Sequence, residues 1–86
     1  MPTITVLFFA RLSDIAGARR TELEIGEGLT AGDAYALLAQ RFPGMEALAD
    51  IVMFAVNTEY VSASHRLAPG DELALIPPVS GGADAI

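Results

Sequence analysis

The sequence predicts an α+β fold in which one main helix packs on one face of a mixed sheet of about five strands. Two observations predict it. One strongly periodic helical segment stands near the middle of the chain, and runs rich in β-branched and aromatic residues lie before and after it. The chain has 86 residues. A chain of this size suits one small domain, which buries about 60–65% of the surface that its unfolded form exposes.

The first predicted strand covers residues 3–10, and its two faces differ in polarity. Alternate positions form a fully apolar face that we expect to point into the core, namely Ile4, Val6, Phe8 and Ala10. The opposite face begins with threonines and ends with Leu7 and Phe9. Either a loop covers Leu7 and Phe9, or these side chains form an exposed patch that binds a partner.

A short helical turn and a second strand follow. We expect the turn over residues 11–17, ended by Gly17. Residues 20–25 then alternate in polarity, which is typical of a strand with one face toward solvent. Its inward positions would be Thr21, Leu23 and Ile25.

The clearest helix begins after Thr30, whose side chain is a good N-cap. Asp33 stands three residues later, in the spacing of a capping box and at the positive end of the helix dipole. One apolar stripe follows at helical spacing, formed by Ala34, Leu37, Leu38 and Phe42. Pro43 and Gly44 then end the helix. Met45, Leu48 and Ala49 predict a second, shorter helical piece.

Three further strands are predicted over residues 51–57, 59–62 and 72–76, with turns at Asn57-Thr58 and Pro69-Gly70-Asp71. The crossover rule favours a strand after the helix that runs parallel to one already formed. This order of elements predicts a β-grasp (ubiquitin-like) fold whose second sheet face stays open for binding. We expect the domain to cover residues 1–76 and residues 77–86 to form a flexible tail.

Composition excludes several classes of function. The chain has no cysteine, so neither a disulfide nor a thiolate site is possible. Its single histidine, His65, has no carboxylate cluster beside it in sequence, so we expect no metal site. The net charge of −6 argues against nucleic acid and favours a partner with a basic cleft. No apolar run reaches the roughly 18 residues that span a bilayer, so we expect a cytoplasmic protein with no membrane role.

The end of the chain carries the strongest functional signal. Pro77-Pro78 favours an extended backbone and leads through Val79-Ser80 to Gly81-Gly82. These six residues reach at most about 20–22 Å, and glycines without Cβ atoms can enter a narrow channel. The alternative is a frayed terminus. No serine stands in a nucleophile turn. We therefore expect a substrate or carrier for other enzymes, with no active site of its own.

Four motifs resemble the small subunit of molybdopterin synthase, in order and spacing, over residues 3–82. They are Val6-Leu7-Phe8-Phe9-Ala10-Arg11, Ala55-Val56-Asn57, Pro69-Gly70-Asp71-Glu72-Leu73 and Pro77-Pro78-Val79-Ser80-Gly81-Gly82. The thiazole-synthesis sulfur carrier and ubiquitin are more distant relatives of this family of sulfur carriers.

The resemblance implies a sulfur-carrier protein of molybdenum cofactor biosynthesis. An adenylyltransferase similar to ubiquitin-activating enzymes would use ATP to adenylate the carboxylate of Gly82, and a sulfur donor would convert it to a thiocarboxylate. The tail, from Pro77 to Gly81, would then insert into the large subunit, which holds the active site. Leu7, Phe9 and Ile76 would form the apolar docking surface, with Arg11 at its rim. The chain itself would bind no cofactor.

This sequence departs from the family pattern after Gly82, where Ala83-Asp84-Ala85-Ile86 follow. A peptide bond then occupies the carboxyl group that would carry sulfur. The simplest hypothesis is a precursor cut by a peptidase between Gly82 and Ala83. The alternatives are a carrier for thiazole or cysteine synthesis, and a ubiquitin-like binding module without carrier function. The chain also has no lysine, so it cannot link to itself through isopeptide bonds.

Overall fold

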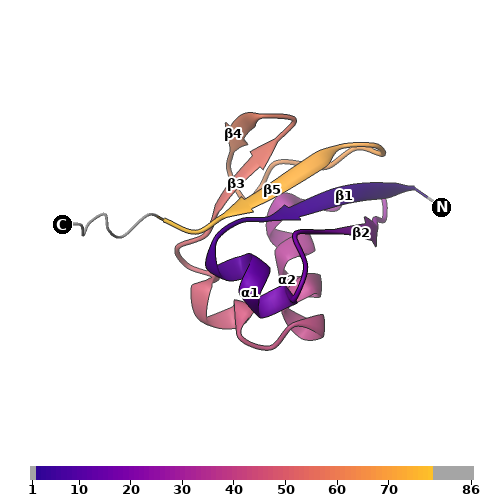
Figure 1. Cartoon of the computed structure of the whole chain (residues 1–86). Coiled ribbons are helices and arrows are strands. Elements are labelled where there is room, and N and C mark those ends of the chain that lie inside the picture. The colour runs from indigo at the N-terminus through magenta and orange to yellow at the C-terminus, as the bar shows by residue number, and fades with distance from the viewer. Residues whose placement is uncertain (1, 79–86) are drawn as a thin grey trace.

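The computed structural model describes residues 2–78 and has the α+β architecture that the sequence predicts (Figure 1). Five strands form one sheet, and the helices lie together on one side of it. The elements in chain order are β1 (Thr3–Phe8), α1 (Arg11–Ala16), β2 (Arg20–Glu24), α2 (Ala31–Arg41), the 3-10 helix η1 (Met45–Leu48), β3 (Met53–Val56), β4 (Glu59–Val61) and β5 (Glu72–Ile76).

The sheet has the strand order β2-β1-β5-β3-β4, which confirms the predicted β-grasp. The first and last strands pair in parallel at its centre, and the other three pairings are antiparallel. The strand after α2, β3, therefore runs in the same direction as β2 but is not its neighbour. The crossover rule gave the direction of β3, whereas the parallel pairing itself is between β1 and β5.

The core lies between the sheet and the helices. Its fully buried side chains come from β1, α1, α2, η1 and β5, the largest being Ile4, Leu12, Leu38, Met45, Leu73 and Leu75. Edge-to-face aromatic pairs, Phe8 with Phe42 and Tyr35 with Phe54, extend this packing toward both ends of α2. Among residues 2–78 no polar or charged side chain is buried.

Helix α2 starts as predicted. The Asp33 backbone N–H donates to Thr30 Oγ1, and the Thr30 backbone N–H donates to Asp33 Oδ2, both at 3.1 Å. Together these bonds complete the capping box. The loop before β5 satisfies two more N–H groups of the first turn, because Ala31 donates to the His65 carbonyl and Gly32 donates to the Ala63 carbonyl.

The predicted apolar stripe of α2 was partly wrong. Ala34 and Leu38 are buried, but Leu37 is 39% exposed and Tyr35 takes a core position in its place. The helix is therefore rotated so that Ala31, Ala34, Tyr35 and Leu38 face the sheet. Leu37 fits the helical period, and only the position of the sheet relative to α2 decides that it faces solvent.

Four of the five predicted strands were too long. β1 ends at Phe8, so Ala10 does not point into the core but is exposed at the turn before α1. β3 begins at Met53, because the N–H groups of Ile51 and Val52 both donate to the Leu48 carbonyl and remain part of the turn after η1. β4 ends one residue early, at Val61, and β2 ends at Glu24, whereas β5 has the predicted bounds.

Candidate functional site

The open face of the sheet, opposite the helices, carries a row of small and apolar side chains. Directly paired residues point to the same face of a sheet. Leu7 of β1 pairs with Ala74 of β5, Ala74 with Ala55 of β3, and Ala55 with Tyr60 of β4. These four residues therefore form one continuous line across four strands.

A second apolar row lies nearer the end of β5. Ile76 pairs with Met53, and Phe9 continues β1 beside them, with its N–H donating to the Leu75 carbonyl at 3.2 Å. Phe9 and Met53 are each 45% exposed, and Tyr60 is 68% exposed. We call the two rows together the open apolar patch: Leu7, Phe9, Met53, Ala55, Tyr60, Ala74 and Ile76.

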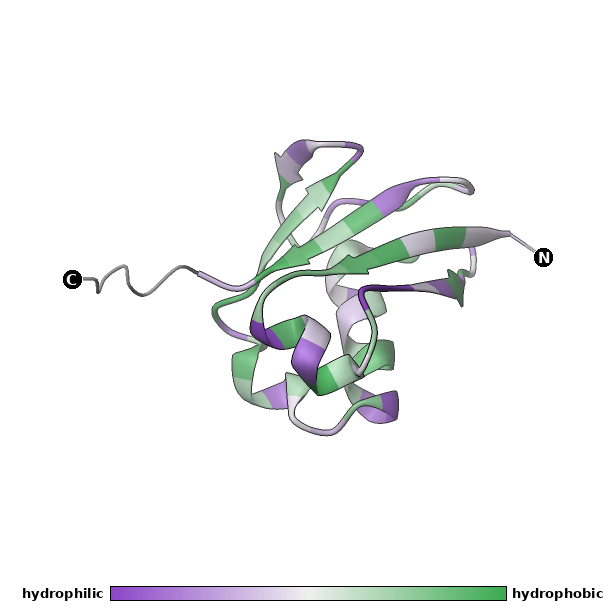
Figure 2. Ribbon diagram, viewed as in Figure 1, coloured by the Kyte–Doolittle hydropathy of each residue, from purple (hydrophilic) through white to green (hydrophobic). Residues whose placement is uncertain are grey.

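The patch is slightly concave. A hollow of about 230 Å³ is lined by members of the patch, with Thr58 and Glu72 at its margin. In Figure 2, β5 and β3 are mostly hydrophobic along their length, whereas β2 at the far edge of the sheet is largely hydrophilic. An apolar hollow on an exposed sheet face is typical of a protein-binding surface.

The chain leaves the sheet directly beside this patch. β1 and β5 are parallel, with Phe8 paired to Leu75, so the carboxyl ends of both strands lie at the same end of the sheet (Figure 1). Pro77 follows β5 and is buried, and Pro78 is exposed. Arg11, the first residue of α1, is exposed just after Phe9. The predicted insertion residues Val79, Ser80 and Gly81, and the predicted carrier residue Gly82, lie outside the described residues.

The opposite end of the open face is acidic. Glu22 of β2 pairs with Thr5 of β1, and Thr5 pairs with Glu72 of β5, so the two carboxylates flank a threonine on the same face as Leu7. Glu24 pairs with Thr3 one step further along. We call Glu22, Glu24 and Glu72 the acidic row. The open face thus changes from apolar at the tail end to negatively charged at the other.

The structure brings together three of the four residues predicted for docking. Leu7, Phe9 and Ile76 share the open face, and the exposure of Phe9 agrees with the partner-binding alternative. Arg11 lies at the margin, on the helix that follows. Sequence reasoning missed Met53, Ala55, Tyr60 and Ala74, which contribute more than half of the patch. The alternation of side chains along β3 and β5 could have indicated which residues share a face. Only the strand order, however, places these four residues beside Leu7.

A hydrogen-bond network joins two of the sequence motifs at the start of β5. Asn57 Nδ2 donates to Asp71 Oδ1 at 3.0 Å, and the Glu72 N–H donates to Asn57 Oδ1 at 3.0 Å. Asn57 and Thr58 both have positive φ, 51° and 74°, which gives the tight β3–β4 turn its twist. The network ties the turn that precedes Tyr60 to the start of β5.

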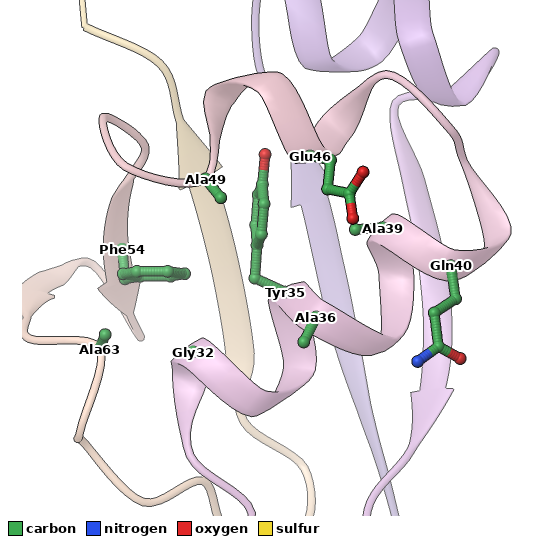
Figure 3. A pocket seen from close by; sticks show the side chains of 9 residues that line it. All are labelled: Gly32, Tyr35, Ala36, Ala39, Gln40, Glu46, Ala49, Phe54 and Ala63. Atoms are coloured by element: carbon green, nitrogen blue, oxygen red, sulfur yellow. The ribbon is translucent and has the colours of Figure 1, made fainter.

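The helix side of the molecule has a separate pocket of about 380 Å³ (Figure 3). Figure 3 shows the ring of Phe54 pointing toward that of Tyr35, with Gln40 at the far end. The rest of the lining is Glu46 and five small residues: Gly32, Ala36, Ala39, Ala49 and Ala63. The Tyr35 hydroxyl donates to the Met45 carbonyl at 2.6 Å, and burial raises the pKa of Tyr35 above its ordinary value of 10.0. Tyr35 therefore has a structural role in the lining of this pocket.

The described part of the chain holds no cluster of side chains suited to a metal ion. No group of three or more His, Cys, Asp or Glu side chains within residues 2–78 could hold a metal ion. The hydroxyls of Ser62 and Ser64 lie 2.9 Å apart and pair with each other, and His65 is exposed. In the same residues, neither α-helix nor the 3-10 helix is long and apolar enough to cross a membrane.

Comparison with known proteins gives relatives of similar length. The molybdopterin synthase sulfur carrier subunit of Chlamydomonas reinhardtii is 37% identical, over 92% of this chain and 98% of the relative. That of Homo sapiens is 35% identical, over 92% and 93%. The small archaeal modifier protein 1 of Haloferax volcanii is 37% identical, over 86% and 94%.

Solved structures share the fold. The crystal structure of the H. volcanii small archaeal modifier protein 1 matches with a TM-score of 0.82 and 31% identity, over 92% of this chain and 100% of the other. A ubiquitin from Caldiarchaeum subterraneum matches with a TM-score of 0.62 and 20% identity, over 94% and 98%, and so supports the ubiquitin-like fold alone. The sequence pattern of the ThiS family matches residues 6–82 and ends at Gly82. The chain therefore belongs to the ThiS family and is similar within it to molybdopterin synthase sulfur carrier subunits.

Proposed function

We propose that this protein is the sulfur carrier subunit of a molybdopterin synthase and carries sulfur as a thiocarboxylate on Gly82. The structural observation that carries the proposal is the apolar patch beside the point where β5 leads into the Pro-Pro and Gly-Gly segment. Identity of 35–38% to sulfur carrier subunits, over 92% of the chain, supports it.

The proposed chemistry takes place at the carboxyl carbon of Gly82. A free Gly82 carboxylate attacks the α-phosphorus of ATP on an activating adenylyltransferase and releases pyrophosphate. The resulting acyl adenylate has AMP as a good leaving group, where the carboxylate had only an oxide. Hydrosulfide released by a sulfur donor then attacks the acyl carbon, displaces AMP and leaves the thiocarboxylate. Because ATP is consumed, we place these steps in the cytoplasm.

The open apolar patch is the proposed docking surface for the large subunit. Leu7, Phe9 and Ile76 would bury their exposed area against it, with Arg11 offering a charge-assisted hydrogen bond at the margin. Docking on this face positions Pro77 at the mouth of the partner's channel. The segment from Pro77 to Gly82 reaches at most about 20–22 Å, so the reacting atom lies well inside the partner. The two glycines let the backbone pass where a side chain would not.

Residues 83–86 must be removed before Gly82 can react. The match to the ThiS family ends at Gly82, and Ala83 to Ile86 lie beyond it. We propose that a peptidase cuts the Gly82–Ala83 bond, in the way that ubiquitin-like precursors are processed.

Comparison of two chains tests the proposal. A chain ending at Gly82 and the full chain ending at Ile86 are each incubated with the activating enzyme, ATP and a sulfur donor, and their masses are measured. We expect sulfur on the shorter chain alone, and transfer of that sulfur to a pterin precursor when the large subunit is added. If the shorter chain is never adenylated, the protein is a ubiquitin-like binding module and the proposal fails.

A second candidate is a protein modifier, favoured by the 37% identity to small archaeal modifier protein 1. The activated Gly82 would then form an amide with a lysine of a target protein. The chain has no lysine of its own, so the product would be a single modification without chains. Adducts on other proteins in the native cell would support this function. A sulfur carrier for thiazole or cysteine synthesis would show the same loading, and the pterin transfer step separates it from our proposal.

A further inference from the structure

Ala10 has a backbone conformation that alanine rarely adopts. Its φ is 53° and its ψ is −129°, between the end of β1 and the start of α1. These angles are those of the first central residue of a type II′ turn, a position that glycine usually occupies. The turn is closed by the Leu12 N–H, which donates to the Phe9 carbonyl at 3.0 Å. An L-residue with a Cβ atom is strained in this region.

Packing does not explain why alanine stands there. Ala10 is exposed, and it makes no side-chain hydrogen bond as the residue before α1. A glycine would lose little buried area and would relieve the strain. The same chain does use glycine at other positive-φ positions beside helices, at Gly17 and Gly44. The Ala10 methyl group narrows the range of φ and ψ that residue 10 can adopt, whereas a glycine there would have a wider range.

The surrounding hydrogen bonds hold the turn on both sides. Before it, the Phe8 N–H donates to the Arg19 carbonyl at 2.8 Å and the Phe9 N–H donates to the Leu75 carbonyl at 3.2 Å. After it, the backbone N–H and the hydroxyl of Ser13 both donate to the Ala10 carbonyl, at 3.0 and 2.8 Å. These bonds tie down the residues before and after the turn, and the strained backbone of Ala10 lies between them.

We propose that Ala10 is a positioning residue that fixes Phe9 and Arg11 for docking. Phe9 precedes the strained turn and projects from the sheet at 45% exposure, and Arg11 follows it. A cavity of about 420 Å³ lies against the turn, lined by Leu7, Phe8, Phe9, Ala10, Ser13 and Arg19. A rigid turn removes part of the entropy cost of ordering Phe9 when the patch binds. This inference rests on the proposed function, because the partner is the large subunit.

Three versions of the chain that ends at Gly82, the form proposed to dock, separate strain from flexibility. One is the parent, one is A10G, and one carries D-alanine at position 10 by chemical synthesis. D-Alanine favours positive φ, so it keeps the turn rigid without strain. We expect both variants to unfold at the parent's temperature or above it. We expect A10G to bind the large subunit about threefold to tenfold more weakly, and the D-alanine chain to bind as tightly as the parent.

A second measurement needs no partner. Backbone ¹⁵N order parameters at residues 9–11 of the free protein should be near about 0.85 in the parent and the D-alanine chain, and below about 0.6 in A10G. A role in stability alone would lower the unfolding temperature and the affinity of A10G together, which overturns the proposal.

Other outcomes also decide it. Unchanged affinity in A10G overturns the positioning role. Equal losses in A10G and the D-alanine chain show that the L-methyl group itself contacts the partner, and overturn it as well. If the parent fails to bind the large subunit, the proposed function fails, and unchanged order parameters in A10G would then separately overturn rigidity at Ala10.

Discussion

Tyr35 is 3% exposed, and its hydroxyl donates a hydrogen bond to the Met45 carbonyl, which links α2 to η1. The sequence did not predict this role, because Tyr35 stands beside the apolar stripe that we expected for α2. A buried tyrosine needs a partner for its hydroxyl, and the partner here is a backbone atom of a 3-10 helix. Such a contact has no sequence signature, since any residue at position 45 offers the same carbonyl.

Tyr35→Phe should lower the free energy of unfolding by about 1 kcal/mol at neutral pH through loss of that hydrogen bond. It should also change how the free energy of unfolding depends on pH in alkaline solution. Burial raises the folded pKa of Tyr35, so the unfolded chain loses its proton first and stability falls as pH rises above 10.0. Tyr35→Phe should lack the part of this decrease in stability that Tyr35 causes.

Denaturant titrations between pH 8 and 12 measure both effects, and the lack of lysine leaves few other groups that titrate there. Tyr60→Phe is the control, since Tyr60 is 68% exposed. An alkaline slope in Tyr35→Phe equal to the parent's would contradict the burial argument.

Asn57 combines a positive φ with two side-chain hydrogen bonds to the start of β5. Asn57→Ala removes both bonds and puts a less tolerant residue at a φ of 51°, so we expect a loss of about 2 kcal/mol in unfolding free energy. Asn57→Gly keeps the backbone freedom and should lose about half as much. Urea unfolding measures both. Equal losses in the two variants would show that the left-handed backbone contributes nothing.

For the helices and strands, residues close together in sequence predicted where an element begins or ends better than they predicted how the elements pack on one another. Thr30 and Asp33 gave the start of α2, and Pro69 to Asp71 gave the turn before β5, because capping and turn chemistry act within a few residues. The face of α2 that packs on the sheet was not predictable to the same degree. Leu37 and Leu38 are neighbours of equal hydrophobicity, and only the sheet decides which of them is buried.

Phe9 and Leu37 form a matched pair for testing the docking face. They are 45% and 39% exposed, and they lie on opposite sides of the sheet. Phe9→Asp should weaken binding of the large subunit at least tenfold (about 1.4 kcal/mol), because a charge replaces an apolar contact at the centre of an interface. Leu37→Asp should change the affinity less than about twofold. Titration calorimetry with the large subunit measures both affinities. An equal loss in both variants would show that the open face is not the docking surface.

At the scale of the molecule, strand order creates the binding face. Leu7, Ala74, Ala55 and Tyr60 come from four strands and meet only because β5 inserts between β1 and β3. The sequence indicated Leu7, Phe9 and Ile76 but could not supply Met53 or Tyr60, since pairing between strands distant in sequence is not encoded in local pattern. The domain boundary that we predicted between residues 76 and 77 and the roles of the tail residues stay as predictions.

The acidic row should guide the approach of the partner. Glu22, Glu24 and Glu72 lie on the docking face, away from the tail, so we expect them to face basic groups of the large subunit. Changing all three to glutamine should slow association about threefold or more at low salt, and should flatten its dependence on ionic strength.

A second triple variant controls for net charge, because it also removes three negative charges but from the helix side: Asp14→Asn, Glu46→Gln and Asp50→Asn. Stopped-flow association rates at several salt concentrations compare the two. Equal effects would mean that overall charge, and not its place on the open face, steers the encounter.

The proposed function requires Gly82 to become the sulfur-bearing end of this chain. The intact mass of the protein isolated from its native cell, under conditions of active cofactor synthesis, is the sharpest test. We expect a species that ends at Gly82 and carries one sulfur in place of one oxygen. A chain that retains Ala83 to Ile86 in every form, including any form that carries sulfur, would contradict it.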